Sequence, residues 1–136
     1  MLNNYTQRLE IQIPQENAYI GRTIMPKQED KLNEFLKTHF NFPSDNLDEI
    51  QEFISEDREM ERIVYGLPEI IAKEFPSSPI TLDFMKYASP NEIILKISIK
   101  SQYNGEISSN KNDRILNCLY SKYKSPKKDY FITMEF

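Results

Sequence analysis

The chain is 136 residues long, with 39% hydrophobic residues, 28% charged residues and a formal net charge of −4. These fractions are those of an ordinary globular protein, and they exclude a chain that is disordered along its whole length. The length fits one domain, predicted over residues 1–136, and the negative charge argues against non-specific nucleic-acid binding by the whole surface. A single cysteine, Cys118, excludes an internal disulfide framework.

The first 27 residues predict a short strand followed by a loop. Apolar residues alternate from Leu9 to Ile13, and Pro14 ends the pattern, so this strand would lie at a sheet edge. At the N-terminus, no basic stretch precedes an apolar run, as a secretory signal would require. No apolar segment approaches the roughly 20 residues that cross a bilayer, so we expect a cytoplasmic location and no membrane partner.

Three helices are predicted before the central strands. The first covers residues 28–40, with apolar residues at helical spacing. Ser44 or Asp45 then caps a second helix, because both side chains can accept a hydrogen bond from a free backbone N–H. The apolar stripe of this helix continues, after a break, as far as Gly66. Pro68 fits the first turn of a third helix, where the N–H that proline lacks has no partner.

Residues 79–100 predict a β-hairpin, joined by residues 88–91, around which the other elements pack. Alternating side chains point to opposite faces of a strand. Seven apolar residues therefore share the core-facing side: Ile80, Leu82, Phe84, Ile93, Leu95, Ile97 and Ile99. The opposite side of the second strand, from Ile94 to Lys100, is expected to face mainly solvent. Helices must cover the apolar side.

A further helix and strand complete the chain. Asn104-Gly105 is a turn signal, Asn110 can cap the helix, and Pro126 follows its end. Residues 130–136 have apolar side chains on both faces, which predicts an interior strand. The order of elements predicts an α+β domain: a small, mainly antiparallel sheet, formed by the central hairpin and the C-terminal strand, with helices packed on one face.

From about residue 62 onward, the chain resembles a loose group of small bacterial proteins. The residues that carry the resemblance are 67–71, 75–76, 80–84, 93–99 and 132–136, which follow the order helix, strand, strand, helix and strand. The resemblance covers a little over half of the chain and implies this fold. The group has no known activity, so the resemblance implies no functional residue.

The lone histidine and cysteine, His39 and Cys118, predict no active site. A Cys–His nucleophile needs a thiol whose pKa is lowered by the imidazole or by a helix N-terminus. Cys118 lies within a predicted helix, between Leu116 and Leu119, where a small hydrophobe is typical. We expect His39 to be a partly buried packing residue. One cysteine and one histidine also cannot supply the four ligands of a zinc site, so no metal and no cofactor are expected.

Acidic residues leave a magnesium site open. Four cluster along one segment and a fifth lies on a predicted strand: Glu56, Asp57, Glu59, Glu61 and Asp83. Carboxylate oxygens are the ligands that Mg²⁺ prefers. Arg58 and Arg62 alternate with these acids, which is more typical of a solvated helix face. An enzyme with a site assembled from scattered acids is therefore our third hypothesis.

Charge divides unevenly along the chain and provides two further hypotheses. Residues 28–74 contain 13 acids and five bases, whereas residues 96–136 contain eight bases and four acids. Our leading hypothesis is a non-enzymatic protein-interaction module, an adaptor or inhibitor, that docks a basic protein partner through an acidic helical face. The acids on the outer side of the second helix would form this face: Asp48, Glu49, Glu52 and Glu56.

The alternative hypothesis is a nucleic-acid-binding module that uses the basic, tyrosine-rich C-terminal region. Four lysines lie there among three tyrosines: Lys122, Lys124, Lys127 and Lys128, with Tyr120, Tyr123 and Tyr130. Lysines contact phosphates and tyrosine rings stack on bases, so this pattern suits a single strand. Both charged regions also fit an ordinary solvated surface.

Overall fold

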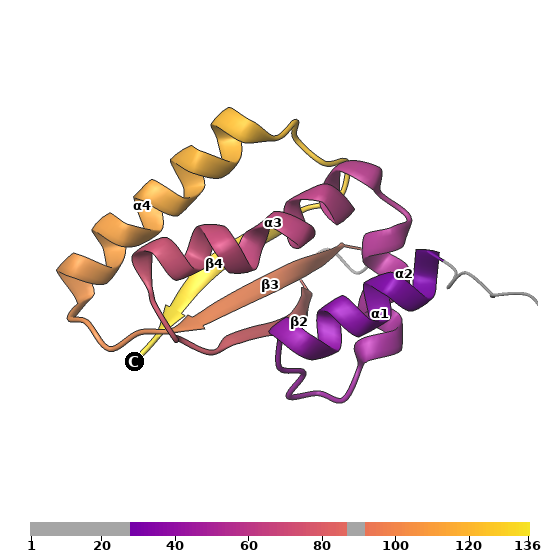
Figure 1. The fold of residues 1–136 in the computed structure, drawn as a ribbon, viewed down its shortest axis with the longest axis horizontal. Helices are drawn as coiled ribbons and strands as arrows, with labels where there is room; N and C mark the ends of the chain where they lie inside the picture. The colour runs from indigo at the N-terminus through magenta and orange to yellow at the C-terminus, as the bar shows by residue number, and fades with distance from the viewer. Residues whose placement is uncertain (1–27, 87–91) are drawn as a thin grey trace, which may run out of the picture. The chain divides into compact units, whose positions relative to one another are not determined.

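The computed structural model describes residues 28–86 and 92–136, and Figure 1 shows how their helices and strands are arranged. The strand predicted at residues 5–13 and the hairpin turn predicted at residues 88–91 lie outside this description. Residues 31–136 form one compact unit. The single domain over residues 1–136 stays a prediction.

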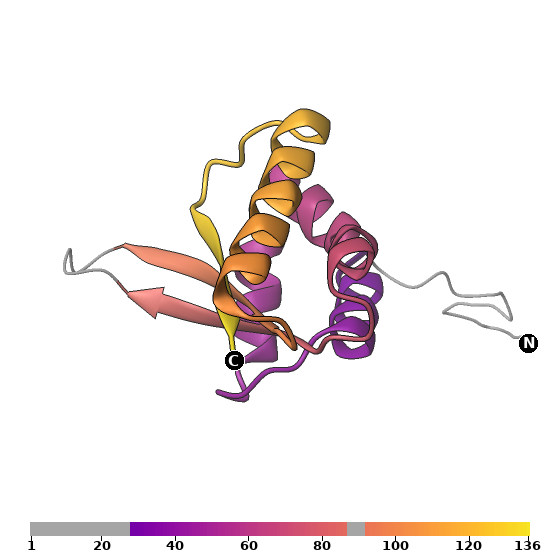
Figure 2. The ribbon, with the colours of Figure 1, turned by 90° about the vertical axis from the view of Figure 1, so that its left-hand side faces the viewer.

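The described residues form an α+β unit, as predicted from the order of patterns. Its elements are α1 (Gln28–His39), α2 (Leu47–Ser55), α3 (Arg58–Glu74), β2 (Ile80–Lys86), β3 (Ile93–Lys100), α4 (Gly105–Lys122) and β4 (Tyr130–Glu135). The sheet order is β2-β3-β4, with β2 antiparallel and β4 parallel to the central strand. Figure 2 shows β2 and β3 on one side and α1 and α3 on the other. The helices pack on the sheet, which confirms the predicted fold class.

The core lies between the sheet and the helices. Leu95 and Ile97, at the centre of β3, are fully buried, which confirms their predicted position on the core-facing side. They pack in one cluster with residues from all four helices, among them Leu36, Ile54 and Ile71. The apolar stripes of the helices and the alternation of the strands thus meet in one hydrophobic layer.

Two details of β3 differ from the prediction. Ile93 is 43% exposed, because pairing with β4 begins only at Leu95 and leaves the start of β3 without a neighbour on that side. On the opposite face, Ile94 and Ser98 are buried instead of solvated. The central strand has neighbours on both sides, and Ser98 lies in register between Thr81 and Thr133.

The last strand was expected in the interior of the sheet, and this expectation is wrong within the described residues. β4 pairs with β3 along one side only and is the edge of the three-stranded order. The side of β4 that carries Ile132 is covered by α4, which packs beside the strand after the parallel crossover. Ile132 is buried there.

α3 runs without interruption through Gly66 and Pro68, so the predicted helix start at Pro68 is wrong. The helix begins after Asp57, whose side chain accepts a hydrogen bond from the Met60 N–H. Glycine and proline disfavour a helix interior by about 1 and 3 kcal/mol. The buried stripe that includes Leu67, fully buried, outweighs this local disadvantage.

The predicted helix caps were also misplaced. Asn104, and not Asn110, caps α4 by accepting a hydrogen bond from the Ile107 N–H at 2.9 Å. Before α2, the Ser44 hydroxyl donates to Asp83 on β2 at 2.8 Å, and Ser44 lies two residues before the cap position. Asn46 occupies the cap position of α2 but makes no capping bond with its side chain.

Candidate functional site

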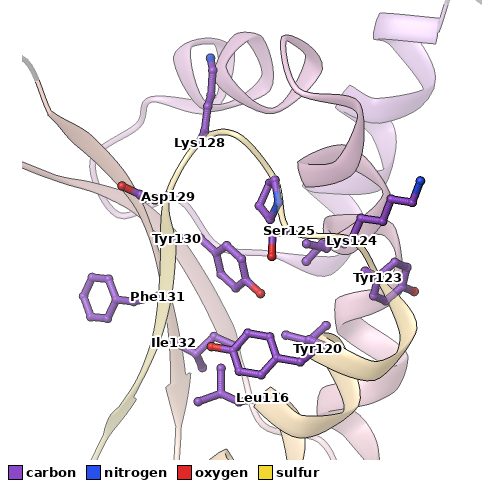
Figure 3. A pocket seen from close by; sticks show the side chains of 13 residues that line it. Leu116, Tyr120, Tyr123, Lys124, Ser125, Lys128, Asp129, Tyr130, Phe131 and Ile132 are labelled. Carbon is purple, nitrogen blue, oxygen red and sulfur yellow. The ribbon is translucent and has the colours of Figure 1, made fainter.

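A cavity of about 510 Å³ lies between the C-terminal half of α4, the loop of residues 123–129 and β4. Figure 3 shows its lining from close by. Four apolar side chains form its inner surface: Ile63 from α3, Leu116 and Leu119 from α4, and Ile132 from β4. The rest of the lining consists of three tyrosines, Phe131 and five residues of the loop: Lys124, Ser125, Pro126, Lys128 and Asp129. The cavity volume falls in the range of small-molecule sites in proteins.

The spacing of residues on α4 and β4 explains why these side chains meet. Leu116 is three residues before Leu119 and four before Tyr120, so these side chains are neighbours on the last turns of α4, and Tyr123 follows as the residue that ends the helix. On β4, alternation places Tyr130 on the same side as buried Ile132. Phe131 and Asp129 point to the other side of the strand in Figure 3.

Tyr120 and Tyr130 form the aromatic part of the cavity. Tyr120 is 69% exposed, which is a large exposure for an aromatic side chain, whereas Tyr130 is half-buried. Burial raises the pKa of Tyr130, and the nearby Tyr120 raises it further, so this phenol remains protonated at neutral pH. Figure 3 shows the two rings directed toward one another, with Ser125 beside Tyr130. Within the described residues, the hydroxyl groups of Tyr120, Ser125 and Tyr130 make no hydrogen bond.

Asp57 attaches the loop of residues 123–129 to the start of α3. Its Oδ2 accepts a hydrogen bond from the Lys128 backbone N–H at 2.8 Å, while its Oδ1 accepts from Met60. The residue is only 5% exposed. Burial alone would raise its pKa, but backbone N–H donors, led by those of Lys128 and Met60, lower the pKa below its ordinary value. The cavity wall is therefore held by an ionised, satisfied carboxylate.

Two further contacts hold the same loop. The Lys128 ammonium forms an ion pair with Glu56 and lies 4.4 Å from the centroid of the Phe53 ring on α2. At the other end of the loop, Tyr123 packs on Gly66 so closely that a β-carbon there would overlap the Tyr123 hydroxyl. Glycine at this position thus permits the ring to lie against α3.

The structure separates the four acids predicted as a docking face into two groups. Asp48, Glu49 and Glu52 are exposed on α2 and have no ion pair within the described residues. Glu56 lies just after the helix and pairs with Lys128, so its charge is partly neutralised. The buried side of α2 is formed by Ile50 and Ile54, as its apolar stripe predicts.

The acids considered for a magnesium site have separate structural roles. Glu56 and Asp57 bind the C-terminal loop, whereas Asp83, on β2, accepts hydrogen bonds from Ser44 and Asn46. Burial would raise the pKa of Asp83, but these bonds, that of the Phe84 N–H and the charge of Lys96 lower it overall. In the part of the chain that the structure describes, no three His, Cys, Asp or Glu side chains are grouped to hold a metal ion.

His39 and Cys118 occupy different surroundings. His39 is exposed at the end of α1, and not partly buried as expected, although its ring centroid lies 4.4 Å from that of Phe35. Cys118 is half-buried on α4 and packs against the core, as predicted for a small hydrophobe.

Sequence reasoning missed Asp57 and Gly66 as residues that shape the cavity. A signal for Asp57 existed, because an aspartate before an apolar-periodic segment is a typical helix cap. Its bond to Lys128 spans 71 residues of sequence, however, and no local pattern predicts it. The contact between Gly66 and Tyr123 likewise joins residues far apart in sequence, so no local pattern predicts it.

The fold and the cavity define an α+β protein with a candidate binding site beside its last strand. No family model matches the chain, and no curated protein or solved structure is found to be similar to it. None of the helices in the described residues is long and apolar enough to cross a membrane.

Proposed function

We propose that the protein is a cytoplasmic, non-enzymatic interaction module of the adaptor or inhibitor type, which docks a basic protein partner through α2. The observation that carries the proposal is the set of exposed acids Asp48, Glu49 and Glu52, which have no ion pair within the described residues. α2 has no basic residue in its last turn to offset them. Exposed charges of one sign accelerate the encounter with an oppositely charged partner.

Helix stability offers a competing explanation for two of these acids. Asp48 and Glu49 lie in the first turn of α2, where negative charge interacts favourably with the helix dipole. The benefit is about 0.3–1 kcal/mol for each acid. A useful experiment must therefore measure partner capture and stability together.

The test is affinity capture from the cytosol of the source cells, with the wild type and the triple variant Asp48→Lys, Glu49→Lys, Glu52→Lys as baits. We expect the variant to lose a partner that the wild type captures, and the captured amount to fall steeply with salt because exposed charges are screened. The melting temperature should fall by only a few degrees, since the helix-dipole terms are small.

A matched control reverses three exposed acids elsewhere: Glu69→Lys on α3, with Glu106→Lys and Asp113→Lys on α4. Glu106 lies in a first helical turn, so the control also includes a dipole effect. The control should retain the partner. Identical captured proteins from the wild type and the α2 variant would refute the docking face.

A second candidate function, binding of single-stranded nucleic acid by the C-terminal region, is supported by one specific observation. The tyrosines that suggested it in the sequence line a cavity of about 510 Å³ beside a cluster of exposed lysines. A salt-dependent complex with an oligonucleotide, weakened when Lys122, Lys124 and Lys127 are changed to glutamine, would support this function. If neither the wild type nor the α2 variant captures nucleic acid from the cytosol, this result would oppose the nucleic-acid function.

A further inference from the structure

The cavity beside β4 combines an apolar inner surface with flat aromatic walls. Buried Leu119 and Ile132 contribute the apolar surface, and the phenol rings of Tyr120 and Tyr130 face the space above it. Flat rings favour planar ligands, because stacking combines burial of apolar area with favourable quadrupole geometry. Tyr120 exposes 69% of its surface without a ring partner among the described aromatic pairs. A planar aromatic group would cover this exposed face.

Polar groups of the cavity suit a ligand that carries hydrogen-bonding atoms on its edge. The hydroxyls of Tyr120, Ser125 and Tyr130 make no hydrogen bond within the described residues. The raised pKa of Tyr130 keeps its phenol protonated, so it can donate as well as accept. Binding sites typically combine a largely apolar surface with a few such groups.

The segment of residues 122–129, which borders the cavity, carries more lysines than acids. Lys124 belongs to the lining, and Lys122 and Lys127 are exposed on either side of it in sequence. None of these three ammonium groups forms an ion pair within the described residues. Asp129 is the acid among the lining residues, whereas Lys128 is already paired with Glu56. Lysine binds phosphate well as a point charge on a flexible stem.

Contacts within the protein hold the two ends of the loop that borders the cavity. Asp57 and Glu56 bind Lys128, and Tyr123 rests on Gly66. A wall that is already in place reduces the entropy lost on binding.

We infer that the cavity binds one nucleotide unit, with its planar base against Tyr120 and Tyr130 and its phosphate near Lys124. The inference rests on the second proposed function and names the place where a base would be held. The unit has two sources of the same chemistry, a free mononucleotide or one unstacked residue of a single strand.

The experiment is titration of ¹⁵N-labelled full-length protein with adenosine 5′-monophosphate (AMP), followed through backbone amide signals. We expect saturable shifts at cavity residues, among them Tyr120, Ser125 and Ile132, and much smaller shifts with inorganic phosphate alone. Tyr120→Ala should weaken AMP binding by at least about fivefold, because base–aromatic stacking is lost. Tyr120→Phe keeps the ring and should retain most of the affinity.

Two further variants test the charge and the specificity of these effects. Lys124→Gln should weaken AMP binding about fivefold or more at low salt and reduce the dependence on salt. Ile107→Ala removes another exposed hydrophobic side chain of α4, 43% exposed and outside the cavity lining, and should change nothing. Tyr120 is largely exposed, so its replacement should leave the fold intact, as a thermal melt will verify.

A single-stranded oligouridylate of about ten nucleotides separates the two sources, since a site of this kind spans roughly 4–16 nucleotides. Tighter binding of the strand, with shifts at the cavity, identifies a strand residue as the ligand, whereas equal or tighter AMP binding identifies a free nucleotide. AMP binding that Tyr120→Ala does not weaken would overturn the inference. Cavity signals that respond only to an acidic, tyrosine-containing peptide would also overturn it.

The same titrations distinguish failure of the inference from failure of the function. If the oligouridylate binds through Lys122, Lys124 and Lys127 while the cavity signals do not move, the inference is wrong and the nucleic-acid function stands. If neither AMP nor the oligouridylate binds, both are wrong.

Discussion

Replacing Asp57 with alanine tests whether one buried carboxylate holds the cavity wall to the helices. In the folded protein, its two oxygens accept hydrogen bonds from the Met60 N–H at 3.3 Å, three residues away, and from the Lys128 N–H at 2.8 Å, 71 residues away in sequence. Alanine removes both acceptors. The Met60 and Lys128 N–H groups then lose their partner at a buried position, since Asp57 is only 5% exposed.

The expected loss follows from these two bonds. Loss of a helix cap destabilises by about 1 kcal/mol. A hydrogen bond to a charged group is worth roughly 1.5–3 kcal/mol, so the free energy of unfolding should fall by about 2.5–4 kcal/mol in total. Asp57→Ser retains a capping oxygen but cannot reach both donors. It should lose only the contribution of the Lys128 bond, roughly 1.5–3 kcal/mol.

The pH dependence of this loss provides a second test. The folded-state pKa of Asp57 lies below the ordinary value of 3.8, so the folded state binds fewer protons than the unfolded state near that pH. The stabilisation by Asp57 is therefore complete above the unfolded pKa and is lost as the pH falls through the folded pKa. The difference in stability between wild type and Asp57→Ala should shrink as the pH decreases from about 5 to about 2.

Urea denaturation at several pH values measures both effects, with m-values compared to verify that the unfolding transition is of the same kind. Asp48→Ala is the matched control, since Asp48 is an exposed acid in a first helical turn, and it should cost less than about 1 kcal/mol. A loss below about 1 kcal/mol for Asp57→Ala at neutral pH would refute the role of the Lys128 bond.

Three further predictions concern the core, the contact between α3 and the loop, and metals. Leu95→Ala should lower the free energy of unfolding by roughly 2–5 kcal/mol, because Leu95 is fully buried; a loss under about 1 kcal/mol in chemical denaturation would contradict its position. Gly66→Ala should destabilise the wild type, because Tyr123 must move away, yet stabilise a Tyr123→Ala background by about 0.5–1 kcal/mol in the same assay, where only helix propensity remains. The melting temperature should not change when a chelator is added, and a fall reversed by one specific divalent ion would show that the fold needs a metal.

The candidate site was only partly visible in the sequence. The lysines and tyrosines of the C-terminal region led to the prediction of a nucleic-acid-binding surface, and three of these tyrosines line the cavity, but no sequence pattern predicted the cavity itself. Which lysine remains available depends on tertiary contacts. Lys128 is neutralised by Glu56, 72 residues earlier, and its backbone is bound by Asp57. Such pairings need the complete fold, since no local pattern relates residues so far apart in sequence.

The order and period of the apolar patterns were sufficient to predict the fold class and the central core positions. Period-two alternation placed Leu95 and Ile97 inward, and helical spacing placed Ile50 and Ile54 inward, because burial of apolar area is the dominant favourable term in folding. Features that depend on contacts between helices and strands could not be predicted from these local patterns. β4 is the edge of the described sheet, and Ile93 pairs with β2 but has no partner on β4, because the path of the whole chain sets which strands become neighbours. α3 continues through Pro68 because burial of its apolar side outweighs the cost of about 3 kcal/mol for proline in a helix interior.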